Sequence, residues 1–371
     1  MHQLVPTQED IVFPSPVLGI MLAVLTQGAN SPPPQEQQFR VWIEPVHLQV
    51  FLRHLAPTRA GPGTGKPPVL IIHGSTLPSA TSAAFRINGV SWMDDLAARG
   101  FDVWALDFLG YGGSDRYPAM NEPAAGAPLG RSPDAAHQIA AAVDFITQRQ
   151  HKTQVDIIAH SGGSLPAGLY ATQSPERLAR LVMFAPVMTR DGPRDTTTMR
   201  AYGIVTAQEQ VARFSGWVPR GEAPVFDPRD LARLAAAYVA TDPTSSSRSP
   251  ASVRFPLGRD ADAADTWAGN LPYDPAKVRA PVLIIRGEWD PITTDADARR
   301  LFDALSSAPV KRDIKISRAT HVMQFESART QLYAEVGLFL AASLPETTSS
   351  SGNLIHDREG VVLRILKKGH P

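Results

Sequence analysis

The chain has 371 residues, no cysteine, and equal numbers of basic (36 Lys and Arg) and acidic (36 Asp and Glu) residues. The lack of cysteine excludes disulfides, thiolate catalysis and cysteine-ligated zinc, and the balanced charge offers no basic excess for binding nucleic acid. The length suits one large α/β domain with added segments.

Residues 1–37 form an N-terminal extension that the sequence leaves open to two interpretations. A mostly apolar stretch at 11–25 precedes a proline- and glutamine-rich linker at 31–38, as in an exported protein with a signal peptide. However, acidic residues and no Lys or Arg precede this stretch, and Pro14 and Pro16 interrupt it. An N-terminal arm of a cytoplasmic protein is therefore the alternative. No other run reaches the roughly 20 apolar residues of a membrane-spanning helix, so we expect no integral membrane span.

The segment 38–187 predicts the first part of an α/β core. Two stretches of alternating character, 39–43 and 48–52, predict a half-exposed antiparallel hairpin. Continuously apolar runs then predict buried parallel strands at 68–72, 101–106, 155–159 and 181–185. Helical patterns lie between these strands, at 90–99, 133–150 and 162–172. This order predicts a parallel sheet with helices on both faces.

The pattern changes after residue 187. The segment 188–278 is rich in Ala, Arg, Asp and Pro, with helical stretches at 206–214 and 228–240, and it predicts a lid or cap inserted over the sheet. The second part of the core follows at 279–343, with strands at 281–285 and 312–316 and helices at 296–305 and 324–342. Residues 344–371 form a C-terminal tail in which no chemistry is evident.

The strongest chemical signal is Ser161, which lies directly after a buried strand and directly before a helix, in the run Ala159-His160-Ser161-Gly162-Gly163. A Gly-x-Ser-x-Gly elbow holds a nucleophilic serine on a tight strand-to-helix turn, where small residues are needed because backbone approaches closely. Here Ala159 replaces the first glycine. A helix that begins at Gly162 would direct amide donors at developing negative charge. The alternative is a turn serine that only caps a helix.

A serine hydroxyl needs a base held in place by a third group, and we predict Asp290 as the acid. Asp290 lies on the loop after the strand at 281–285, at the carboxyl edge of the sheet. Glu288 and Asp191 are rival acids, and Asp290 could also merely begin the turn at Pro291.

We predict His321 as the base, because it follows the last strand and so lies on the same sheet edge as Ser161 and Asp290. A solvated loop histidine is the alternative. Other histidines occupy helices, the early hairpin or the tail, where they would not reach Ser161: His54, His137, His151, His356 and His370.

Together these motifs resemble the α/β-hydrolase family, in its lid-bearing serine hydrolase and esterase branch, over about residues 39–343. Two further segments are similar to that family: His73-Gly74 after the third strand, and the run 107–114 with its Asp-x-x-Gly-x-Gly spacing. The resemblance implies a mostly parallel eight-stranded sheet flanked by helices, with a helical lid inserted after strand 6. It also implies an oxyanion hole from the backbone amides of Ser75 and Gly162. His73 and His160 are structural in such a family.

We expect no cofactor and no metal. The run 61–66 lacks the first glycine of a phosphate loop and precedes its strand, and Asp115 replaces the last glycine of a dinucleotide fingerprint at 110–113. The sequence contains no His-Glu-x-x-His motif and no calcium loop.

The predicted function is a serine hydrolase that cleaves a small-molecule carboxylic ester through an acyl-enzyme on Ser161, with His321 as base and Asp290 as its orienting acid. Aromatic residues of the insertion would line an apolar pocket for an apolar or aromatic substrate: Tyr202, Phe214, Trp217, Phe226, Tyr238, Phe255 and Trp267. Lactone, amide, peptide and carbon–carbon bond hydrolysis fit the same residues. A cofactor-free perhydrolase and a non-catalytic ligand-binding protein are the further alternatives. The sequence does not indicate the oligomeric state.

Overall fold

The computed structural model describes residues 36–195 and 199–343. The proposed signal peptide and nearly all of the N-terminal extension, together with the tail at 344–371, lie outside the described residues. No helix of the described ranges is long and apolar enough to cross a membrane.

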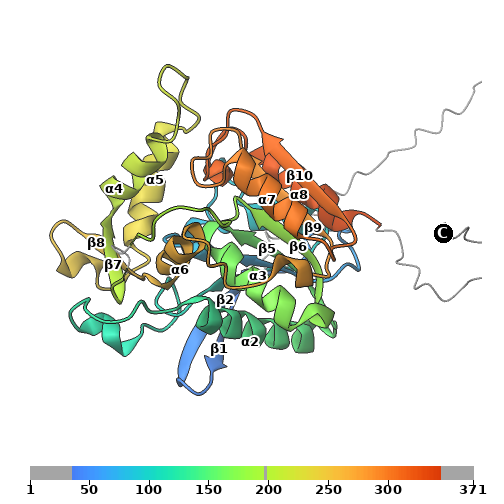
Figure 1. Cartoon of the computed structure of the whole chain (residues 1–371), viewed down its shortest axis with the longest axis horizontal. Helices are drawn as coiled ribbons and strands as arrows, with labels where there is room; N and C mark the ends of the chain where they lie inside the picture. The colour runs from blue at the N-terminus through green and yellow to red at the C-terminus, as the bar shows by residue number, and fades with distance from the viewer. Residues whose placement is uncertain (1–35, 196–198, 344–371) are drawn as a thin grey trace, which may run out of the picture. The chain divides into compact units, whose positions relative to one another are not determined.

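The core is an eight-stranded sheet with the strand order β1-β2-β4-β3-β5-β6-β9-β10 (Figure 1). The hairpin of β1 and β2 is antiparallel and joins the sheet by antiparallel pairing of β2 with β4, whereas the remaining neighbours are parallel. The strands are β1 Gln37–Ile43, β2 Leu48–Leu55, β3 Val69–Ile72, β4 Val103–Asp107, β5 Val155–His160, β6 Leu178–Phe184, β9 Val282–Gly287 and β10 Lys311–Ile316. The predicted fold class is confirmed.

Helices cover both faces of this sheet, which explains the continuously apolar strands. Two buried clusters of apolar side chains lie between the layers, one against α2, α3 and α7 and the other against α1 and α8. These helices are α1 Trp92–Ala98, α2 Ser132–Gln150, α3 Ser164–Gln173, α7 Asp295–Ala304 and α8 Arg329–Ala341.

Two predicted helices begin later than the sequence suggested. A 3-10 turn at Ser161–Gly163 precedes α3, and another at Met323–Phe325 precedes α8. The first turn includes Ser161 itself and the second begins two residues after His321, and with these 3-10 turns the α-helices begin two and five residues later than predicted.

Between β6 and β9 the chain leaves the sheet, and we call residues 188–278 the inserted segment. It contains a separate antiparallel pair, β7 Tyr202–Thr206 and β8 Ser252–Pro256, and three helices, α4 Ala207–Ser215, α5 Pro228–Val239 and α6 Gly258–Trp267. Helices α4 and α5 match the predicted helical stretches. The β7–β8 pair and α6 were not predicted, so the segment is not purely helical.

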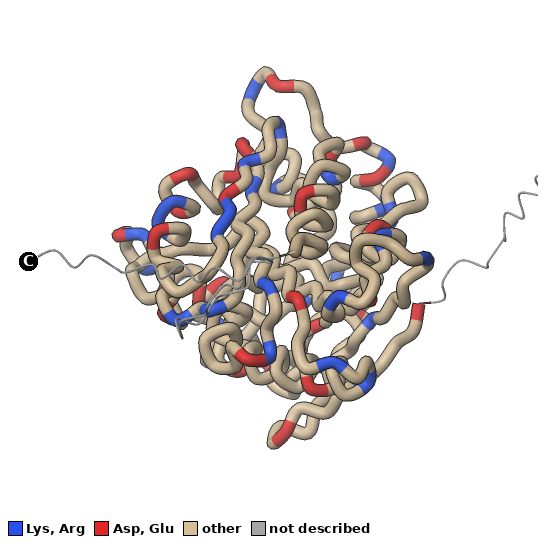
Figure 2. Tube along the Cα trace, turned by 90° about the vertical axis from the view of Figure 1, so that its right-hand side faces the viewer, with Lys and Arg blue, Asp and Glu red and all other residues tan. Residues whose placement is uncertain are grey.

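The helices of the inserted segment differ in what they pack against (Figure 1). Helix α6 packs against α2, α3 and the Ser161–Gly163 turn, whereas α4 and α5 pack against each other. In the view of Figure 2, basic and acidic residues are interspersed along the described trace.

Candidate active site

Ser161 occupies a strained turn between β5 and α3. Its φ of 52° is in the left-handed region, which is unusual for a residue with a side chain and is typical of a nucleophile elbow. A Cβ atom on Gly163 would lie 2.3 Å from the carbonyl oxygen of His73, so glycine is required two residues after the serine. At Ala159, by contrast, the methyl group is accommodated within the buried strand.

The structure brings Ser161, His321 and Asp290 together in one hydrogen-bonded chain. Nε2 of His321 lies 2.7 Å from Oγ of Ser161, and Nδ1 of His321 lies 3.0 Å from each carboxylate oxygen of Asp290. Asp290 also accepts hydrogen bonds from the backbone amides of Ile292 at 2.8 Å and Thr293 at 3.0 Å. His321 and Asp290 are both buried. These contacts orient the imidazole with Nδ1–H toward the carboxylate and Nε2 free to accept a proton from the serine.

The rival acids lie elsewhere. Glu288 is exposed and accepts a hydrogen bond from the backbone amide of Arg318. Asp191 is exposed and pairs with Arg300 at 3.8 Å. Neither has a hydrogen bond to His321 among the described residues.

Two further histidines hold the surrounding loops. His160 donates from Nε2 to the carbonyl oxygen of His321 at 2.9 Å and stacks on Phe184 with ring centroids 4.4 Å apart. Burial lowers the pKa of His160 to about 3, so its ring is neutral near pH 7. His73 donates from Nδ1 to the carbonyl oxygen of Gly74 at 2.7 Å and accepts from the amide of Phe108 at 3.2 Å. Burial, reinforced by the charge of Arg259, lowers the pKa of His73 as well.

A buried carboxyl group that no sequence pattern identified holds the loop that carries His321. Glu326 accepts hydrogen bonds from both the backbone amide and the hydroxyl of Thr320, the residue before His321. Burial raises the pKa of Glu326 to about 7, with a smaller contribution from the charge of Asp290. This contact depends on a turn formed after the strand, so the spacing of Thr320 and Glu326 in the sequence does not predict it.

The two predicted oxyanion-hole residues are neighbours in space. Ser75 and Gly162 both line the cavity beside Ser161, and a Cβ atom on Gly162 would lie 2.6 Å from Oγ and 3.8 Å from the backbone nitrogen of Ser75. The hydroxyl of Tyr111 donates to the carbonyl oxygen of Ser75 at 2.8 Å and so holds this loop. Ser75 and Gly162 thus border the same cavity as Ser161.

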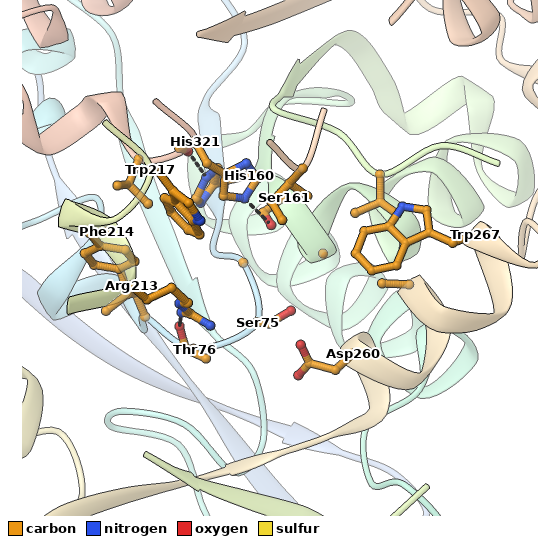
Figure 3. A pocket seen from close by; sticks show the side chains of 17 residues that line it. Ser75, Thr76, His160, Ser161, Arg213, Phe214, Trp217, Asp260, Trp267 and His321 are labelled. Atoms are coloured by element: carbon orange, nitrogen blue, oxygen red, sulfur yellow. Dashed lines mark hydrogen bonds between the residues drawn. The ribbon is translucent and has the colours of Figure 1, made fainter. Parts of the chain in front are cut away.

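A cavity of ≈ 110 Å³ opens onto Ser161 and His321 (Figure 3). Three of the seven aromatic residues predicted from the insertion line it, namely Phe214, Trp217 and Trp267. The ring of Trp217 meets that of His321 edge-on, with centroids 5.4 Å apart. The other four are buried elsewhere: Tyr202, Phe226, Tyr238 and Phe255.

Two charged residues of the inserted segment, Arg213 and Asp260, also line this cavity and were not predicted. Which face of α4 or α6 lines the cavity depends on how the whole inserted segment packs. The local sequence of each helix does not predict that packing. Among the described residues, no group of His, Asp and Glu side chains could hold a metal ion.

Comparison with known proteins gives a consistent result for the fold. A family model described as alpha/beta hydrolase fold matches residues 67–328. A comparison with curated protein sequences finds no match. Among solved structures, naproxen esterase from Bacillus subtilis is similar, with 17% identity, a TM-score of 0.54, and coverage of 83% of this chain and 92% of that one.

Two other similar solved structures are described as a thioesterase domain and as a dienoate hydrolase. The thioesterase domain from the curacin biosynthetic pathway has 14% identity and a TM-score of 0.52, and the match covers 83% of this chain and all (100%) of that one. The 2-hydroxy-6-oxo-6-phenylhexa-2,4-dienoate hydrolase from Rhodococcus sp. strain RHA1 has 16% identity, a TM-score of 0.55, and coverage of 83% and 99%. At such identities these likenesses establish the fold alone.

Proposed function

The chain belongs to the α/β-hydrolase fold family, and from this premise we propose that it is a serine hydrolase that cleaves a small-molecule carboxylic ester. The observation that carries the proposal is the hydrogen-bonded chain from Asp290 through His321 to Ser161. A serine on a strained elbow, an imidazole within hydrogen-bonding distance and a buried carboxylate behind it meet the requirements of nucleophilic acyl transfer.

In the proposed reaction, Oγ of Ser161 attacks the ester carbonyl carbon while Nε2 of His321 takes the hydroxyl proton. The carbonyl oxygen becomes an oxyanion, which the amides of Ser75 and Gly162 would stabilise by hydrogen bonds. His321 then gives its proton to the departing alcohol, and the acyl group stays on Ser161. A water molecule, deprotonated by His321, attacks the acyl-enzyme; the bond between the acyl carbon and Oγ of Ser161 breaks, the acid is released, and His321 returns the proton to Ser161. Throughout, Asp290 holds the imidazole and stabilises its cationic form.

We propose that residues 188–278 act as a lid over this site, between the core parts 38–187 and 279–343. The contribution of Phe214, Trp217 and Trp267 to the cavity wall supports this role. A cavity of ≈ 110 Å³ with aromatic walls favours a small substrate with an apolar portion. An ester is the first choice because it is the least demanding of the acyl substrates that the same residues could process. Thioester, lactone, amide and carbon–carbon cleavage are alternative outcomes of the test, as is peroxide-dependent perhydrolysis.

The proposal is tested by stopped-flow hydrolysis of p-nitrophenyl acetate, butyrate and octanoate. We expect a burst of nitrophenol followed by slower steady turnover, because acylation by an activated ester precedes deacylation. Ser161→Ala should abolish both phases, and Ser82→Ala, whose hydroxyl donates to the carbonyl of Pro78, should retain them. Ligand binding by the folded protein with no turnover of any ester, thioester, lactone or amide would instead favour the non-catalytic binding protein.

A further inference from the structure

Arg213, on α4, presents a guanidinium group with unused donors at the cavity that contains Ser161 (Figure 3). Its Nη2 donates to Oγ1 of Thr76 at 3.0 Å and to Oε1 of Gln210 at 2.9 Å. Both acceptors are neutral and belong to buried residues. These bonds use two of the five donor hydrogens of an arginine and hold the group in one orientation, which leaves the remaining donors available to a ligand.

No carboxylate forms an ion pair with Arg213 within the described ranges, although most other arginines of those ranges have one. The rings of Phe214 and Trp217 flank the group, with centroids 5.6 Å and 5.7 Å from its central carbon. The aromatic walls and the neutral hydrogen-bond partners thus position a cation without neutralising it.

Asp260, on α6, is a carboxylate that lines the same cavity. A second guanidinium group, that of Arg259, also interacts with its charge. The neighbouring Arg259 is buried and stacks on Phe108 and Tyr111, with centroids 4.6 Å and 4.4 Å away. Burial raises the pKa of Asp260, and the charge of Arg259 counteracts this rise more than the charge of Arg213 does. Asp260 therefore has two guanidinium groups near it, of which only that of Arg213 lines the cavity. Arg213 is exposed as a residue, so its charge is partly solvated, and it has no carboxylate of its own within the described ranges to compete with a ligand in the cavity.

We propose that the cavity selects substrates that carry a carboxylate group, bound by Arg213. A planar carboxylate matches the fork of the guanidinium and can accept two parallel hydrogen bonds from it. The inference rests on the proposed function in one respect, because it places this carboxylate on the same molecule as the bond that Ser161 attacks. Binding of the carboxylate itself needs no turnover, so it is measured separately.

Benzoate, benzamide and benzamidinium make a matched set of probes, because they share one shape and differ in charge. We expect isothermal titration calorimetry to show benzoate binding about tenfold more tightly than benzamide, equivalent to about 1.4 kcal/mol, and benzamidinium binding most weakly. Arg213→Gln should abolish the preference for benzoate, and Arg213→Lys should keep part of it. Arg229→Gln is the matched control, since Arg229 lies on α5 of the same inserted segment with a side chain that is 91% exposed.

Asp260→Asn should strengthen benzoate binding, because it removes the opposing charge from the cavity. Equal affinity for benzoate and benzamide, or tighter binding of benzamidinium, would overturn the proposal, as would a benzoate preference that survives in Arg213→Gln. An unchanged melting temperature for Arg213→Gln separates loss of the ligand contact from loss of the fold. If benzoate binds as expected but Ser161 forms no acyl-enzyme, the carboxylate site stands and the proposed hydrolase activity fails.

Discussion

The parallel sheet and the inserted segment differ in how they hold their functional side chains. At the carboxyl edge of the sheet, Ser161, His321 and Asp290 are joined by hydrogen bonds and fixed by loops between buried strands. In the inserted segment, Arg213 and Trp217 lie on or directly after a short helix whose surface is largely exposed. Under the proposed function, this difference implies a division of work in which the sheet would perform the chemistry and the inserted segment would select the substrate. Changes in the sheet should then affect all substrates alike, and changes in the inserted segment should affect substrates unequally.

The largest effect is expected for Asp290→Asn. The amide presents a donor as well as an acceptor to Nδ1 of His321 and favours the wrong imidazole tautomer, which in a triad of this kind lowers kcat about 10⁴-fold. The loss should be equal for p-nitrophenyl acetate and octanoate. Glu288→Gln, at the exposed rival acid, should leave kcat unchanged. A loss that differs strongly between the two esters would break the proposed division of work.

Gly162→Ala should lower kcat about 10²- to 10³-fold, the usual cost of losing an oxyanion donor. The added methyl group would lie 2.6 Å from Oγ of Ser75, so the Ser75 side chain must shift, and the methyl group would crowd the space between the two residues where the oxyanion is proposed to bind. Gly216→Ala is the control at the end of α4, where the backbone is already helical, with φ −69° and ψ −12°. Steady-state kinetics with the nitrophenyl esters measure the change in kcat. Normal turnover by Gly162→Ala would contradict the proposal that the amides of Ser75 and Gly162 form the oxyanion hole.

The buried Asp156 should affect the stability of the sheet without affecting activity at the edge where Ser161 lies. Asp156, at the amino end of β5, is buried beside Arg180 at 3.6 Å, and burial raises its pKa to about 7. The folded state thus holds this proton more tightly than the unfolded chain, and the resulting stability is lost as the pH rises toward 7. Relative to Asp156→Asn, the wild-type free energy of unfolding should fall by up to about 1.4 kcal/mol per pH unit between pH 5 and 7.

Urea unfolding across this pH range measures the difference directly. Asp295→Asn is the control: a hydrogen bond from Lys315 lowers the pKa of exposed Asp295, so its effect on the free energy of unfolding should stay constant between pH 5 and 7. Ester hydrolysis by Asp156→Asn should remain normal, since the residue lies at the far end of the strand from Ser161. A constant difference in stability from pH 5 to 7 would show that Asp156 is ionised throughout.

The smallest effect concerns the helix caps of the two regions. Thr206 caps α4 and exchanges hydrogen bonds with Glu209, and Thr294 caps α7 in the same way with Asp297. Replacing either threonine by alanine should cost about 1 kcal/mol. Hydrogen exchange should show local loosening of α4 in Thr206→Ala and a loss of global stability in Thr294→Ala. Equal, global effects of both variants would show that the inserted segment unfolds together with the sheet.

The two regions also differ in what their sequences reveal. Strand β3 is a continuous apolar run, β5 is mostly apolar, and Ser161 lies in a local motif, so the sheet and its elbow were predictable. The β7–β8 pair was not, because it joins Tyr202 to Pro256 across the whole of α4 and α5. Arg213 and Asp260 escaped prediction for the same reason, since their approach to one cavity depends on tertiary packing.

The most direct test of the central claim is intact-mass spectrometry after treatment with a fluorophosphonate. We predict one covalent adduct per chain on the wild type and on Arg213→Gln, and none on Ser161→Ala. Peptide mapping should locate the adduct on Ser161. An unmodified wild-type protein, or equal labelling of Ser161→Ala, would contradict the assignment of Ser161 as the activated nucleophile.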